Sequence, residues 1–253
     1  MGPVLLLARL FMTGIFIYYT VNVFTKLPAP PLFVWALVAA QVVGVVLIVL
    51  GYETRLGALL LAICILASLS YRGQFGFDNY VETIGQKDLA VAAGFLFLFA
   101  YGPGPLAIDR GREGSRLFAQ AAKNPSVVGP LLVLARIMSV VVFCFFGVSK
   151  ILHTARIQSF MVKHNPSVPV ALVYPAIVVQ LIPSAMVLLG YKTRYAAFLL
   201  CGFCIMAPAL FWSHFGNPSH VEQFLLDFAT APGLLFMLAN GPGPLSLDAR
   251  SGS

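Results

Sequence analysis

The chain has 253 residues, of which 59% are hydrophobic and only 10% are charged, and its formal net charge is +7. Soluble domains carry about 25% charged residues, so this composition excludes an ordinary soluble domain and indicates an integral membrane protein. Anionic lipid headgroups and an uneven distribution of Lys and Arg across a membrane account for the positive charge, so nucleic acid is not needed as a partner.

Hydrophobic runs of about 20 residues, the length that crosses a bilayer, recur along the chain. They are too long for strands and lack period-two alternation, so they predict helices. The predicted spans are residues 4–25, 32–51, 55–72, 87–105, 130–151, 169–190, 194–213 and 223–241. The first run has no cationic stretch ahead of it and no cleavage pattern after it, so we interpret it as a spanning helix. We therefore expect an all-α integral membrane protein with eight transmembrane helices.

The topology follows from the distribution of Lys and Arg. An even number of spans places both termini on one side, which carries ten Lys and Arg residues, whereas the opposite side carries six. Positive charge accumulates in cytoplasmic loops. We expect both termini to be cytoplasmic and call the other side the outer side.

Two sequence patterns occur twice. Leu50–Arg55 reads LGYETR and Leu189–Arg194 reads LGYKTR, while Gly102–Asp109 and Gly241–Asp248 both begin with GPGPL. Both pairs are 139 residues apart, which predicts a duplicated four-helix module. Because each copy has an even number of helices, the two insert in the same orientation as parallel repeats.

The duplication divides the chain into two predicted four-helix bundles. We assign residues 1–110 to the first repeat, 111–129 to a cytoplasmic linker and 130–253 to the second repeat. Arg9 and Arg136 also correspond, but they are only 127 residues apart. The second repeat therefore has twelve extra residues between its first and second helices.

Together these motifs resemble the DoxX family. They are an Arg near the start of the first helix, the G-x-x-K of Gly147–Lys150, L-G-x-x-T-R after the second helix, and G-P-G-x-L-S-L-D after the last. The resemblance implies a small membrane subunit, in the inner membrane of a bacterium or archaeon, associated with redox enzymes such as thiosulfate:quinone oxidoreductase. Gln41 and Gln180 stand where family members often carry Glu, and the first repeat lacks the lysine of G-x-x-K.

Ionisable groups inside a span cost free energy, so they usually turn inward and pair. Arg9 and Arg136 lie close enough to the cytoplasmic interface to act as snorkelling anchors. Asp88 and Asp227 suit the N-terminal ends of helices electrostatically. The functional alternative is an outer-side polar pocket in which Asp227, Glu222 and Lys150 bind a headgroup or a quinone carbonyl. The candidate residues for binding a quinone or lipid are Arg136, Lys150, Gln180, Glu222, Asp227, Arg9, Gln41 and Asp88.

Sulfur and imidazole groups give two weaker site hypotheses. Cys201 and Cys204 form a C-x-x-C within a span, a redox spacing for which plain packing is the favoured interpretation. The histidines all lie on the outer side of the second repeat, at His153, His164, His214 and His220. No close His spacing supports a metal or haem site there.

The sequence shows no nucleotide-binding loop, catalytic triad or zinc motif, and whether the chain catalyses a reaction stays open. We predict a membrane subunit of a quinone-linked redox system that binds quinone or lipid and docks an oxidoreductase partner, a prediction that rests mainly on resemblance. The alternatives are a non-catalytic scaffold or assembly subunit of a larger membrane complex and a small-solute transporter. The differences between the copies place the specific function on the outer side of the second repeat.

Overall fold

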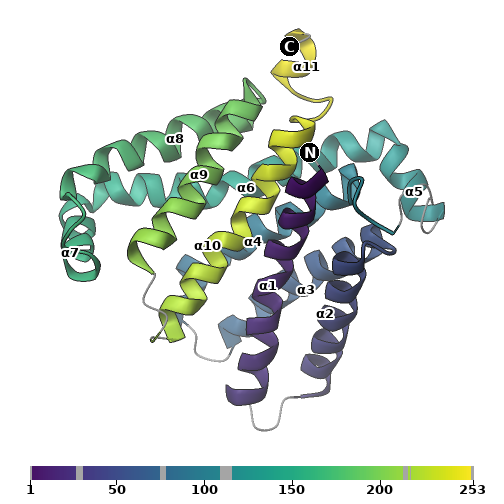
Figure 1. Cartoon of the computed structure of the whole chain (residues 1–253), viewed down its shortest axis with the longest axis horizontal. Coiled ribbons are helices and arrows are strands. Elements are labelled where there is room, and N and C mark those ends of the chain that lie inside the picture. The colour runs from purple at the N-terminus through teal and green to yellow at the C-terminus, as the bar shows by residue number, and fades with distance from the viewer. Residues whose placement is uncertain are drawn as a thin grey trace.

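The computed structural model describes residues 2–26, 31–74, 78–108, 116–212, 216 and 218–251. Across these residues the chain forms helices and no strand (Figure 1). In chain order they are α1 (Gly2–Lys26), α2 (Leu32–Leu50), α3 (Thr54–Gln74), α4 (Asp78–Tyr101), α5 (Arg116–Lys123), α6 (Pro125–Leu152), α7 (Thr154–His164), the 3-10 helix η1 (Val170–Leu172), α8 (Val173–Leu189), α9 (Thr193–Phe211), α10 (Pro218–Asn240) and α11 (Leu247–Ser251).

Within the described residues, six segments are long and apolar enough to cross a membrane, and α3 adds a shorter apolar stretch over Thr54–Ser68. The six are Gly2–Val21, Leu32–Leu50, Pro125–Leu152, Val170–Leu189, Thr193–Phe211 and His220–Asn240. An all-α integral membrane protein is thus confirmed, while the number of eight spans stays a prediction.

Some helix boundaries differ from those predicted. The helix expected at residue 87 begins at Asp78, and the one expected at residue 130 begins at Pro125. Polar residues in the first turns of α4 hid its start, whereas α6 begins with Pro125, a residue that is well tolerated at the first position of a helix. Asn124 caps α6, because its side chain accepts a hydrogen bond from the Ser126 backbone N–H.

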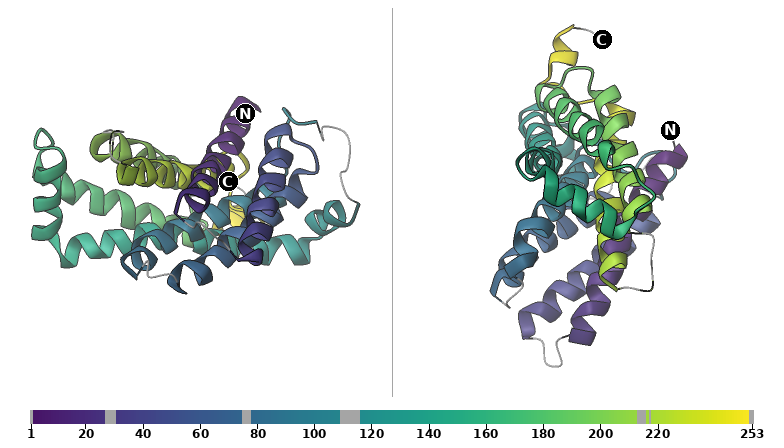
Figure 2. Two further views of the ribbon diagram at one scale, coloured as in Figure 1. Left: turned by 90° about the horizontal axis from the view of Figure 1, so that it is seen from below. Right: turned by 90° about the vertical axis from the view of Figure 1, so that its left-hand side faces the viewer.

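Short helices occupy segments that were predicted as loops. The described part of the linker contains α5, and α7 fills the place of the twelve extra residues between α6 and α8. Figure 2 shows α7 at one extremity of the molecule, packed beside the start of α8. The insertion is therefore a folded element beside the outer ends of α6 and α9.

The repeated L-G-Y-x-T-R motif forms the same helix end twice. Gly51 ends α2 with a φ of +70° and Gly190 ends α8 with a φ of +67°, a left-handed conformation that favours glycine. An added Cβ at Gly190 would lie 2.4 Å from Ser246 Cβ. Glycine is required at both positions because of the backbone angle and the close neighbours.

The two halves interlock. The first helix of each half packs on the last helix of the other, since α1 packs mainly on α10 and α6 on α4. Helices α4 and α10 cross where an added Cβ on Gly233 would lie 3.1 Å from the Gly94 Cα, an approach that only small residues permit. The two predicted four-helix halves therefore share an interface formed by α1, α4, α6 and α10, and their division into two repeats stays a prediction.

The two buried arginines support loops and do not snorkel. Arg9 is 1% exposed and donates to the carbonyls of Leu106 and Ile48, and Arg136 is 3% exposed and donates to the carbonyl of Leu245. Both guanidinium groups therefore hold the G-P-G-P-L turns against the helix ends. The snorkelling anchor that we expected is replaced by an internal structural contact.

Candidate functional site

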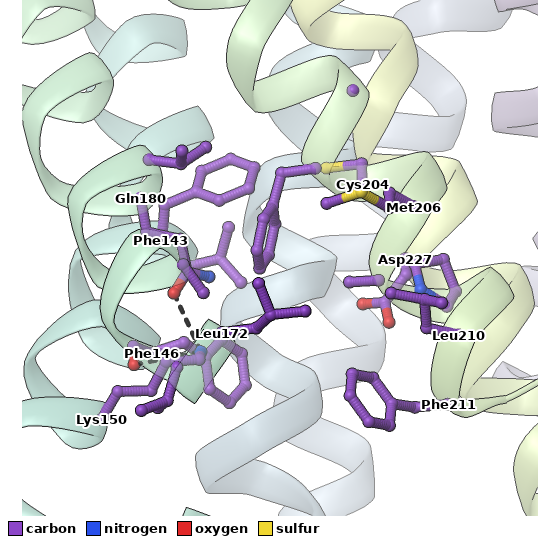
Figure 3. A pocket seen from close by; sticks show the side chains of 18 of the residues that line it. Phe143, Phe146, Lys150, Leu172, Gln180, Cys204, Met206, Leu210, Phe211 and Asp227 are labelled. Atoms are coloured by element: carbon purple, nitrogen blue, oxygen red, sulfur yellow. Dashed lines mark hydrogen bonds between the residues drawn. The ribbon is translucent and has the colours of Figure 1, made fainter. Parts of the chain in front are cut away.

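A cavity of about 810 Å³ lies in the second half of the chain. Its walls come from α6, α7, α8, α9 and α10, and Lys87 of α4 joins them from the first half. Most of the lining is aliphatic or aromatic, with a few polar groups among these side chains (Figure 3). This combination of an apolar wall with a few fixed polar groups is typical of ligand sites.

One polar group on the wall is an amide held by a lysine. Lys150 Nζ donates to Gln180 Oε1 at 2.8 Å, drawn as a dashed line in Figure 3, and to the Phe146 carbonyl at 3.4 Å. An ammonium group only donates hydrogen bonds, so it determines that the amide oxygen faces it. Among the described residues, no side chain or carbonyl accepts a hydrogen bond from Gln180 Nε2. Lys150 and Gln180 together present donors to the cavity.

The second polar group is an ion pair between the halves. Lys87 Nζ lies 2.6 Å from Asp227 Oδ1 and donates to Gln223 Oε1 at 2.8 Å. Both lysine side chains of the cavity also lie against one aromatic ring, since the Nζ atoms of Lys87 and Lys150 are 5.8 and 5.6 Å from the Phe146 centroid. An aromatic face stabilises a desolvated cation.

The positive charge of the cavity is only partly balanced. Lys87 and Asp227 neutralise each other, whereas Lys150 forms no ion pair within the part of the chain that the structure describes. In Figure 3 Lys150 and Gln180 lie on one side of the cavity and Asp227 and Cys204 on the other. The geometry suits a ligand with a hydrogen-bond acceptor that lies near Lys150.

The C-x-x-C pair contributes one side chain to the cavity. Cys204 lines it and its Sγ lies 3.1 Å from Thr230 Oγ1, while Cys201 is buried and does not line it. Both cysteines are free thiols. The redox hypothesis for the pair stays a prediction, and the observed contact is a buried polar packing contact.

The first half places different groups at the corresponding positions. Tyr19 is the counterpart of Phe146, and its hydroxyl donates to Asp88 Oδ1 at 2.8 Å. Phe146 has no hydroxyl, and Asp227 is paired with Lys87. Gln41, the counterpart of Gln180, is buried but does not line the cavity.

Three further candidates lie outside the cavity lining. Glu222 is 7% exposed and accepts a hydrogen bond from the Tyr18 hydroxyl at 3.2 Å, which links α10 to α1. Arg9 of α1 and Arg136 of α6 hold the turns described above, and Arg136 lies 14 residues before Lys150 on α6. The structure thus brings together Lys150, Gln180, Asp227 and Cys204 of the predicted site.

Two of the predicted outer-side histidines lie close together, and a third lies at another junction of the fold. The rings of His164 and His220 lie 5.9 Å apart beside Trp212, and His153 is exposed at the junction of α6 and α7. His214 lies outside the described residues. Over the residues that are described, no group of three His, Cys, Asp or Glu side chains could hold a metal ion.

Sequence reasoning missed Lys87, Gln223 and α7. The counterpart of Lys87 in the second half is Leu226, and each precedes an aspartate that both halves share. This difference was the available sequence signal that Lys87 has a special role. Nothing in the sequence indicated that Lys87 reaches across to the other half, because this depends on how α4 and α10 cross. The apolar residues of α7, such as Phe160 and Met161, cover the cavity near its outer end.

Comparison with known proteins matches the second half to one family. Residues 131–214 match the DoxX family model. The inner membrane protein YqjF of Escherichia coli (strain K12) is 27% identical over 117 residues, which cover 46% of this chain and 88% of the relative. The inner membrane protein YphA of the same organism is 26% identical over 125 residues, covering 47% of this chain and 89% of the relative. No solved structure matches the chain.

Proposed function

From the premise that residues 131–214 form a DoxX-family segment, we propose that the chain is a membrane subunit of a quinone-linked redox system. It holds a quinone in the cavity of its second half and docks an oxidoreductase partner. The relatives are inner membrane proteins, and each aligns with slightly less than half of this chain. Their length supports a tandem duplication of the module, in which the second copy carries the site.

The observation that carries the proposal is the donor pair on the cavity wall. A quinone is a flat apolar ring with two carbonyl acceptors, and reduction places negative charge on the oxygens. Lys150 and the Nε2 group of Gln180 donate hydrogen bonds to one carbonyl, while Phe143, Phe146 and Phe203 supply apolar contacts for the ring. A hydrogen bond that involves a charged group contributes about 1.5–3 kcal/mol, more than a neutral one.

The test is quinone binding by the full chain in mild detergent. We expect mass spectrometry to find quinone in the purified protein and added decyl-ubiquinone to bind saturably. Lys150→Met should weaken decyl-ubiquinone binding about tenfold or more, because it removes a charged donor worth at least about 1.4 kcal/mol. Lys163→Met, at an exposed position of α7 outside the cavity lining, is the matched control and should bind as the wild type does.

Two outcomes would contradict the proposal. One is a purified protein without quinone that also fails to bind decyl-ubiquinone. The other is undiminished binding by Lys150→Met. A stoichiometric protein partner without any bound cofactor would favour the scaffold function instead.

A further inference from the structure

The cavity has a mouth along α9, a helix long and apolar enough to span a membrane. Phe198, Leu199 and Met206 of α9 line it, yet they are 63%, 45% and 57% exposed, so they lie at its mouth. Eight residues separate Phe198 from Met206, which corresponds to about 12 Å along the helix. Both lie within the segment Thr193–Phe211, which is long and apolar enough to span a membrane. The mouth therefore faces lipid.

The other edge of this mouth belongs to α8. Pro175 lines the cavity and is exposed, and Ala176 and Val179 line it further along the helix. On the α9 side, Gly202 lines the cavity, and no atom of another element lies within 4 Å of the place where its Cβ would be. We call this opening, between Pro175–Val179 and Phe198–Met206, the lateral slot.

The outer end of the cavity is covered by apolar side chains. Ile157, Phe160 and Met161 of α7 line it there together with Phe211 and Trp212, and Met161 is only 5% exposed. Phe160 packs on both aromatic residues, with ring centroids 6.1 Å from Phe211 and 5.5 Å from Trp212. A polar molecule arriving from water would have to pass this packed layer, whereas a lipid reaches the slot directly.

We propose that the ligand enters from the bilayer through the lateral slot and that its apolar tail stays in the slot while its head binds at Lys150 and Gln180. The proposal rests on the proposed function, and it restricts the ligand to amphipathic lipids with an acceptor head and a long tail. A tail passing from lipid to the apolar slot exchanges one apolar environment for another, so head contacts determine selection within the membrane. Gly202 sets the width of the slot for the tail.

The test separates the contribution of the ligand's tail to binding from that of its head group. Binding of decyl-ubiquinone is compared with binding of the same ring carrying a methyl group instead of the decyl tail, in the wild type and in Gly202→Phe. The new ring obstructs the slot, so decyl-ubiquinone affinity should fall about tenfold or more, while the methyl analogue should bind within about twofold of wild type. The substitution is compatible with α9, because glycine is a weaker helix former than phenylalanine.

Gly14→Phe is the matched control. Gly14 also has open space around its Cβ position and lies on α1, outside the cavity lining. It should leave the binding of both probes unchanged. If the wild type binds both probes and Gly202→Phe does not change decyl-ubiquinone binding, the proposed entry through the lateral slot is refuted. The proposed function then still stands. Wild-type binding of neither probe overturns the proposed function, and with it the slot.

Discussion

The ion pair between Lys87 and Asp227 joins the two halves, so it predicts how strongly the halves depend on each other. The Lys87 side chain is 7% exposed and that of Asp227 is 20% exposed, and their atoms are 2.6 Å apart. Removing one member of a buried pair strands a charge and costs about 3–5 kcal/mol. Because Asp227 faces the cavity, we expect the lower end, about 3 kcal/mol, for Lys87→Met and for Asp227→Asn.

The double variant tests whether the cost of each single variant comes from a stranded charge. With Lys87→Met and Asp227→Asn combined, no charge is left stranded, and replacing both members of a buried pair is often neutral. We expect the double variant to lie within about 1 kcal/mol of the wild type, which is a strong coupling between the two positions.

Thermal unfolding in detergent, followed by near-ultraviolet circular dichroism, measures these effects. In a chain of this size a change of 1 kcal/mol shifts the midpoint by about 2–4 °C, so each single variant should lose roughly 6–12 °C. Lys192→Met is the control, because Lys192 is exposed and lies outside the cavity lining. Single shifts below about 2 °C, or a double variant whose loss equals the sum of the single losses, would refute the role of the pair.

Two further pairs of variants, each with its own control, test the framework around the site. Gly190→Ala should cost at least about 2 kcal/mol, because it forces alanine into a left-handed conformation and against Ser246, whereas Gly202→Ala, in open space, should be neutral or stabilising in the same unfolding assay. Tyr19→Phe removes the donor to Asp88 and should cost about 1–3 kcal/mol without changing quinone binding, since Tyr19 is outside the cavity lining. Tyr174→Phe, at an exposed tyrosine, should change stability by less than about 0.5 kcal/mol. Equal stability of the two tyrosine variants would contradict the Asp88 contact.

The local structure was largely predictable because it depends on local signals. Apolar runs predicted the long helices, and the repeated glycines marked ends that both adopt a positive φ. The outer side of the second half was also the predicted place of the site, from Lys150 and Asp227, and both side chains line the cavity.

The arrangement of the helices was not predictable in the same way. Hydrophobicity says that α1 and α10 are apolar, but inside a membrane every helix is apolar, so it does not select the neighbour of each. The close approach of Gly94 and Gly233 permits α4 and α10 to cross, and at the same interface Lys87 lies beside Asp227. The prediction that Arg9 and Arg136 snorkel failed for a related reason. Their carbonyl partners at Leu106 and Leu245 lie about a hundred residues away in sequence.

The difference between Tyr19 and Phe146 has a consequence for the symmetry of the two halves. In a symmetric dimer of identical modules, both copies would carry the same residue. A substitution that opens a cavity in one copy would therefore open it in the other and destabilise both. A single chain can keep the Tyr19 hydroxyl on Asp88 as rigid packing in one half and pair Asp227 across the halves in the other. Because the two halves of one chain differ at these positions, the cavity can lie in the second half alone while the first half supports it.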